Sequence, residues 1–400
     1  MKKFALASYL MYFLAGLVVT TIGAIMPQLL GHYNLSYTEG GTLVFIGSIG
    51  FLIGVPLSAY MMHRFGEKVT LASSALIIAV TQSMMLTLPE YSWITILNFF
   101  NSLSVSAIEV VVAALVMERF VSRRAVTMSY LEVSFGLGAL GMPVFASGFI
   151  ALGHWQWVFA VTGLISLVMG IVWMRIQYSR EEETSSNQAV DAVEVAPSAT
   201  VTGRHKIVLL SIFLLMIFVY CGIEGSLNNF LSSIFISYFG SSEYYASISI
   251  GAFWGAMVIG RLATSWIIRR VNYSRFLLIS MSLSLLILLA FLVFRQEWAG
   301  YLLVPLLGFT MSGVYSITMV YANHTLPNMA RTVTSLITGF AGFGNAVFPV
   351  LIGYTLDRAP IQVSLMLIAS YAVAFLILLL IIMGNYRKWK RVDADEAIKI

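Results

Sequence analysis

The chain has 400 residues, of which 59% are hydrophobic and only 10% charged, and its mean hydropathy is +0.88. Because soluble domains carry about 25% charged residues, this composition excludes a water-soluble globule and indicates a protein whose surface faces lipid. The net charge of +5 lies mainly in short segments between apolar runs. It is therefore a membrane-topology signal and does not indicate a nucleic-acid partner.

Twelve apolar runs are long enough to cross a bilayer, which requires about 20 helical residues. In chain order, the expected spans are 4–30, 39–62, 69–88, 92–117, 126–152, 156–177, 206–238, 244–268, 275–294, 298–322, 332–356 and 360–385. The first run is too long for the apolar core of a signal peptide, so we expect an uncleaved first helix. The predicted fold class is an all-α membrane protein.

One polar break divides the spans into two sets of six. Residues 178–205 are acidic and rich in small residues, a composition typical of a solvated, flexible linker. The linker separates an N-terminal half, 1–177, from a C-terminal half, 206–385, which is followed by a tail at 386–400. Two such halves predict a pseudo-twofold axis along the membrane normal, with the substrate bound between them.

The positions of lysine and arginine predict the orientation in the membrane. With the N-terminus inside, the outer loops contain only Arg295 and Arg358, and Arg261 lies within the eighth span. Every other lysine and arginine falls in an inner segment. We therefore expect a multi-pass protein of a bacterial inner membrane, with both termini and the linker in the cytoplasm.

Three of the 18 acidic residues lie well inside spans: Glu109 in the fourth, Glu132 in the fifth and Glu224 in the seventh. An ionisable group at mid-membrane costs several kcal/mol unless it faces the bundle interior or water. Burial at the centre of the fourth span would favour the protonated carboxyl of Glu109, as a proton carrier requires. The alternative is a carboxyl that is hydrogen-bonded between helices and only fixes their packing.

Glu224 belongs to a polar stretch of the seventh span. Glu224 and Asn228 are four residues apart and share one helix face, and Asn229 follows them. A carboxylate and amides on one face can bind several hydroxyl groups at once, and we expect the neighbouring Gly222 and Gly225 to allow local unwinding. The alternative is a polar lock between helices.

Three further residues in the C-terminal half have two interpretations each. Trp254 in the eighth span is either a stacking platform for a sugar ring or part of the core. Asn345 in the eleventh span either contacts substrate or hydrogen-bonds between helices. Arg261 either anchors a gate or extends its side chain to the membrane interface.

Glu132 stands near the inner end of the fifth span. We expect it to pair with Arg119, Arg123 or Arg124 in an inner gate, to contact substrate, or to contribute to packing. The sequence has no phosphate-binding glycine loop, no metal-ligand spacing and no Ser/His/Asp arrangement. We therefore predict no enzyme, no ATP hydrolysis and no cofactor, and the single Cys221 has no disulfide partner within the chain.

Twelve spans, a central linker and a basic loop after the second span resemble the major facilitator superfamily. Its signature in that loop, Gly-x-x-x-Asp-Arg-x-Gly-Arg/Lys-Arg/Lys, aligns with residues 59–68, where Arg64, Gly66 and Lys68 match. The leading glycine is replaced by Ala59 and the gating aspartate by His63. The resemblance implies a gating role for this loop, which here would rest on Arg64.

Within that superfamily, the chain is most similar to the fucose permease and glucose permease group of bacterial proton–sugar symporters. The similar segments are Ile108-Glu109, 131–140, 222–224, 229–231, Phe253-Trp254 and 259–262. The resemblance places on Glu109 the role in transport and proton coupling that a helix 4 glutamate has in the fucose permease. That relative also uses an aspartate in helix 1, whereas the first span here has no acidic residue.

These observations predict proton-coupled symport of a monosaccharide or related small polar solute by alternating access, in a protein that functions as a monomer. The expected roles are proton coupling by Glu109 and Glu224; substrate binding by Glu224, Asn228, Asn229, Trp254 and Asn345; and gating by Glu132, Arg64 and Arg261. The alternative is proton-coupled efflux of a drug, lipid or metallophore. Gly138, Gly141, Pro143 and Gly148 of the fifth span loosely resemble the glycine-proline motif of antiporters, and a cavity rich in methionine and phenylalanine would favour this alternative. A transporter-like sensor is a third possibility.

Overall fold

The computed structural model describes residues 2–120, 124–176, 203–326 and 329–397. In these ranges the chain forms fourteen helices and no strand, and twelve spans are long and apolar enough to cross a membrane. The predicted all-α membrane fold is confirmed. Most of the expected linker, 178–202, lies outside the described residues, and residues 203–205 already belong to a helix.

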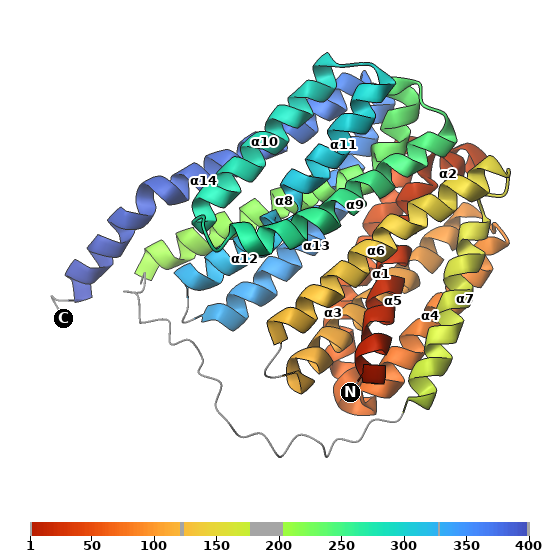
Figure 1. The fold of residues 1–400 in the computed structure, drawn as a ribbon, viewed down its shortest axis with the longest axis horizontal. Coiled ribbons are helices and arrows are strands. Elements are labelled where there is room, and N and C mark those ends of the chain that lie inside the picture. Colours follow the sequence, from red (N-terminus) through yellow and green to blue (C-terminus); the bar gives the residue numbers. More distant parts are fainter. Residues whose placement is uncertain (1, 121–123, 177–202, 327–328, 398–400) are drawn as a thin grey trace.

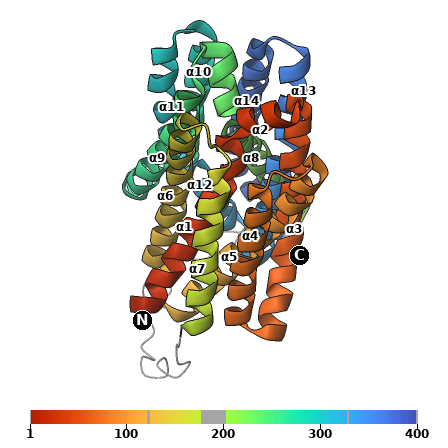
Figure 2. The ribbon, with the colours of Figure 1, turned by 90° about the vertical axis from the view of Figure 1, so that its right-hand side faces the viewer.

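The two halves each contain seven helices (Figure 1). The N-terminal half consists of α1 (Lys2–Ala24), α2 (Met26–Tyr33), α3 (Tyr37–Phe65), α4 (Glu67–Leu86), α5 (Tyr91–Arg119), α6 (Arg124–Ala151) and α7 (Trp157–Arg175). The C-terminal half consists of α8 (Gly203–Phe239), α9 (Glu243–Ile267), α10 (Tyr273–Val293), α11 (Glu297–Met311), α12 (Val314–Thr325), α13 (Ala330–Arg358) and α14 (Ile361–Ala397). Seen from the side in Figure 2, the helices run roughly along one axis, as helices that cross one bilayer do.

The first expected span, 4–30, is broken between α1 and α2 at Ile25. Pro27 in the first turn of α2 has no backbone N–H and cannot donate to the carbonyl of Gly23, four residues earlier. The Ser232 hydroxyl of α8 donates to that carbonyl instead, at 3.0 Å. The break therefore provides a contact between the two halves.

The tenth span is also broken, between α11 and α12, at Ser312 and Gly313. The Tyr220 hydroxyl of α8 donates to the Met311 carbonyl at 2.9 Å. The expected unwinding next to Glu224 is wrong, because α8 is one continuous helix. Its glycines serve close packing instead: a side chain at Gly222 would collide with Phe348 of α13.

The most extensive contacts between the halves are made by α3 along α13, α6 along α9, and α1 along α8. We call the end of the bundle where α1 begins and α3 ends the termini end, because both chain ends lie there (Figure 1). The opposite end, where α3 begins and α13 ends, is the far end. Hydrogen bonds between the halves gather towards the far end, where they join Tyr37 and Thr38 to Asp357, Gln28 to Glu243, and Ser247 to Pro143.

Candidate functional site

A cavity of about 380 Å³ lies between the two halves. It is lined by α1, α3, α5 and α6 on one side and by α8, α9, α12 and α13 on the other. Eight of the nine predicted site residues line it, namely Glu109, Glu132, Glu224, Asn228, Asn229, Trp254, Arg261 and Asn345. A larger groove of about 780 Å³ lies between α4 and α7, but it contains no charged side chain, so the central cavity is the candidate site.

Glu109 contributes a carboxyl group to the cavity from α5. The Tyr12 hydroxyl of α1 donates to the backbone carbonyl of Glu109 at 2.9 Å, which fixes the position of this turn. Among the described residues, no side chain forms a hydrogen bond or ion pair with the Glu109 carboxyl. An ionised carboxylate without a partner is energetically costly in a membrane cavity, so this carboxyl group is expected to bind a proton. Acidic residues retained at such positions usually serve a function.

Trp254 lies between the amide-bearing helix α8 and the charged part of the cavity. Its indole Nε1 donates to Asn228 Oδ1 at 2.9 Å, and its ring makes an edge contact with Phe135 of the other half. The Arg261 guanidinium carbon lies 5.8 Å from the centre of the Trp254 ring, within cation–π range. The side chain is 3% exposed, so its orientation is fixed by these neighbours.

The two neighbouring asparagines of α8 differ in the atoms that they leave for a ligand. Asn229 Nδ2 donates to the Gly225 carbonyl of its own helix at 2.8 Å, which leaves Oδ1 as an acceptor. Asn228 accepts at Oδ1 from Trp254, which leaves Nδ2 as a donor. Asn345 of α13 packs against Gly225, where a side chain would collide with the Asn345 amide oxygen.

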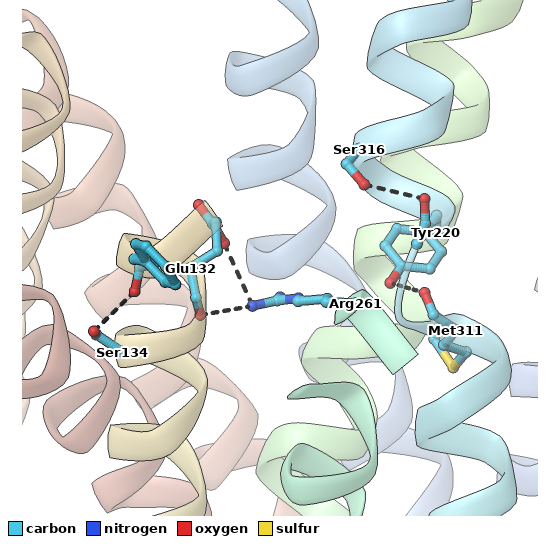
Figure 3. Close-up of polar contacts among 8 residues, drawn as sticks. Glu132, Ser134, Tyr220, Arg261, Met311 and Ser316 are labelled. Atoms are coloured by element: carbon cyan, nitrogen blue, oxygen red, sulfur yellow. Dashed lines mark hydrogen bonds and ion pairs between the residues drawn. The ribbon is translucent and has the colours of Figure 1, made fainter. Parts of the chain in front are cut away.

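Arg261 forms an ion pair across the two halves (Figure 3). Its Nη1 lies 3.4 Å from Glu132 Oε2 and 3.4 Å from the Glu132 backbone carbonyl. The expected pairing of Glu132 with Arg119 is wrong: Arg119 pairs with Glu67 of α4 at 3.6 Å, within the N-terminal half. Glu132 lies two turns into α6, where this helix packs against α9 and brings it to Arg261.

The remaining predicted positions lie elsewhere. Arg64 is exposed at the end of α3, with its guanidinium carbon 5.9 Å from the Phe65 ring, and it does not line the cavity. Arg123 lies outside the described residues, and the structure describes only the backbone of Arg124. The gating role of Arg64 stays a prediction.

Comparison with known proteins decides the family. The family model described as Major Facilitator Superfamily matches residues 8–349. The chain belongs to the Major Facilitator Superfamily. It is therefore a membrane transporter of small molecules and not an enzyme, with the twelve apolar helices of a multi-pass membrane protein.

Several relatives match nearly the whole chain. The glucose/mannose transporter GlcP of Bacillus subtilis (strain 168) is 28% identical over 397 residues, which cover 99% of this chain and 96% of the relative. A TsgA homolog of Buchnera aphidicola subsp. Baizongia pistaciae (strain Bp) is 20% identical, with 96% of both chains covered.

Solved structures of two superfamily transporters share the fold. The nucleoside transporter NupG aligns with a TM-score of 0.73 at 14% identity, covering 95% of this chain and 98% of its own. A bacterial homolog of the human lysosomal transporter Spinster, in an inward-facing and occupied conformation, aligns with a TM-score of 0.72 at 12% identity, covering 97% and 96%.

The sequence reasoning missed part of the polar lining that this transporter has on α5. Asn98, Asn101 and Ser102 line the cavity together with Val105 and Glu109. Asn98, Ser102, Val105 and Glu109 follow one another at intervals of four, three and four residues, which places them on one helix face. This periodicity was a readable signal. Tyr12 of the first span had no such signal.

Proposed function

We propose that this transporter is a symporter that couples protons to a monosaccharide or related small polar solute by alternating access. One observation carries the proposal: the Glu109 carboxyl, unpaired within the described part of the chain, lines the same cavity as the Asn228 and Asn345 amides and the Trp254 ring. The cavity volume of about 380 Å³ is near the lower end of ligand pockets, which measure about 300–1,000 Å³. The name of the glucose/mannose transporter relative supports the same substrate class.

The polar groups of α8 suit a ligand that carries several hydroxyls. A hydroxyl both donates and accepts, so it can bind the free Nδ2 of Asn228 and the free Oδ1 of Asn229. Glu224 and Asn345 add a carboxylate and an amide to the same cavity. We assign substrate binding to these four residues and to the ring of Trp254.

Proton coupling follows from the charges that line the cavity. Three carboxyls, those of Glu109, Glu132 and Glu224, share it with one guanidinium, that of Arg261. Arg261 is paired with Glu132, so ionisation of both other glutamates would leave an excess of two negative charges in a membrane cavity. We therefore assign proton binding to Glu109 and Glu224.

Alternating access requires contacts that open and close at each end of the cavity. We propose that Arg261 and Glu132 form part of the gate at the termini end, with Arg64 at its rim. The asymmetry of basic residues supports a bacterial inner-membrane location with the termini end in the cytoplasm. On that orientation the hydrogen bonds of the far end close the periplasmic side. A monomer contains the complete cavity, which supports function as a monomer.

Uptake into proteoliposomes tests the proposal. With an inward proton gradient, the intact transporter should accumulate glucose, mannose or a related monosaccharide above equilibrium. Glu109→Gln should abolish this accumulation but retain sugar exchange without a gradient, because only the proton site is lost. Glu118→Gln in the same helix, at an exposed position outside the cavity, is the matched control.

Two outcomes would count against the proposal. Uptake that is equally fast and equally concentrative without a proton gradient would exclude coupling. Counterflow of hydrophobic cations or lipids, with none of the sugars active, would favour the alternative of proton-coupled efflux. A counterflow panel that contains both compound classes distinguishes these results in one experiment.

A further inference from the structure

Asp357, at the far end of α13, accepts three hydrogen bonds from the first turn of α3. The backbone N–H groups of Tyr37 and Thr38 donate to its two carboxylate oxygens at 2.8 and 2.7 Å, and the Thr38 hydroxyl donates at 2.5 Å. The first N–H groups of a helix have no partner within the helix, and the positive end of the helix dipole attracts a carboxylate. This contact joins the two halves, because Tyr37 and Asp357 are 320 residues apart in the sequence.

The start of α3 does not need Asp357 in order to be a helix. Ser36 already caps it, because the Ser36 hydroxyl accepts from the Glu39 backbone N–H at 3.2 Å while the Glu39 side chain accepts from the Ser36 backbone N–H at 2.8 Å. This reciprocal cap lies entirely within the N-terminal half. The cap would therefore survive separation of the halves, whereas the bonds to Asp357 would break.

Small residues bring the two backbones close enough for this contact. A Cβ atom at Gly41 of α3 would lie 2.8 Å from the Val350 Cα atom of α13. A Cβ atom at Gly353 of α13 would collide with the Tyr37 carbonyl. At α3 and α13, closure of the far end is thus a backbone-to-backbone fit, and Asp357 is the charged group that bonds across this helix pair.

The two ends of this helix pair differ in sequence. α13 ends on Gly353-x-x-x-Asp357-Arg358, whereas α3 ends on Ala59-x-x-x-His63-Arg64. Because each helix ends where its partner begins, the two stretches occupy opposite ends of one antiparallel pair. The acidic residue is present at the far end, and a histidine stands in the equivalent position at the termini end.

We propose that Asp357 is a one-sided latch that stabilises the conformation closed at the far end and thereby sets the balance between the two access states. Its loss shifts the population towards the conformation closed at the termini end. The shift is modest, roughly threefold to tenfold, because the carboxylate is exposed to solvent and partly screened. The latch acts without any substrate, so its test is independent of the proposed sugar specificity.

Hydrogen–deuterium exchange of the complete transporter in lipid nanodiscs, without substrate, reads the latched amides directly. Asp357→Ala should speed exchange in residues 36–45 and 349–356 and slow it at the termini ends of α6 and α9, which would pack more tightly. The matched control Arg358→Ala removes the neighbouring charge, which contacts Tyr354, and should change neither region.

Faster exchange confined to residues 36–40, with no change at the termini end, would overturn the proposal, because Asp357 would then be only a local helix cap. Ser36→Ala provides the reference for such local fraying. If Asp357→Ala does not fold, Asp357→Asn carries the test: it keeps an acceptor but loses the charge, and it should shift both regions in the same directions by a smaller factor. No shift in Asp357→Asn would also overturn the latch.

Discussion

The Arg261 guanidinium of α9 lies 3.4 Å from the Glu132 carboxylate of α6, and this ion pair joins the two halves at the cavity. The Glu132 side chain is 52% exposed, so water screens the attraction. Exposed ion pairs contribute about 0–1 kcal/mol. A weak pair is consistent with the proposed gate, because a gating contact has to break in every transport cycle and cannot be strongly stabilising.

Reversing these two charges tests the gate. Glu132→Arg and Arg261→Glu should each slow sugar counterflow, because each places two like charges face to face, and the double variant should recover part of the rate. Neutral Glu132→Gln should change the rate by at most about fivefold. Glu67→Gln removes the Arg119 pair within one half and should leave counterflow unchanged. Failure of the double variant to recover any activity would argue against a paired gate.

Trp254→Phe separates the ring of Trp254 from its hydrogen bond. Phenylalanine keeps an aromatic surface but leaves Asn228 Oδ1 without the donor that the indole supplies at 2.9 Å. A buried polar group that loses its partner costs about 1–3 kcal/mol, so the half-saturation concentration of the sugar should rise about tenfold. Trp266→Phe, at an exposed position of the same helix, is the control. An unchanged half-saturation concentration would show that this bond does not position the site.

Most of the fold was predictable because membrane spans depend on local composition. Twelve apolar runs, one polar break and a family signature predicted the helices and the two halves. The spacing of four between Glu224 and Asn228 predicted a shared helix face, and both residues line the cavity. Such features need only the periodicity of a helix and the cost of burying charge in lipid.

The pairing across the halves was not predictable in this way. Arg261 and Glu132 are 129 residues apart, and their contact depends on how α6 crosses α9. Asp357 lies at the end of α13, next to a loop, where an acidic residue gives no hydropathy signal. The break before α2 could be predicted from Pro27. The glycines near Glu224 predicted a second break, but α8 is continuous there and these glycines pack closely against α13 instead.

Gly138→Ala should destabilise the transporter, because α1 and α6 cross with their backbones in contact there. A Cβ atom at Gly138 would collide with the Phe13 carbonyl and lie 2.9 Å from the Leu17 backbone nitrogen. Overpacking of this kind costs about 1–3 kcal/mol, so the melting temperature in detergent should fall by several degrees. Gly148→Ala in the same helix meets nothing within 4 Å and should leave it unchanged. Equal melting temperatures for the two variants would contradict this packing.

Cys221 offers a reporter of cavity occupancy that needs no engineering. It is the only cysteine in the sequence, it lines the cavity, and it is 3% exposed. A small membrane-permeant maleimide should therefore label it slowly, and a bound sugar should slow the reaction further by filling the space beside Glu224 and Gly225. Labelling rates measured by intact mass across a panel of monosaccharides should rank them in the same order as counterflow does. A sugar that is transported but leaves the labelling rate unchanged would place its binding site outside the cavity next to α8.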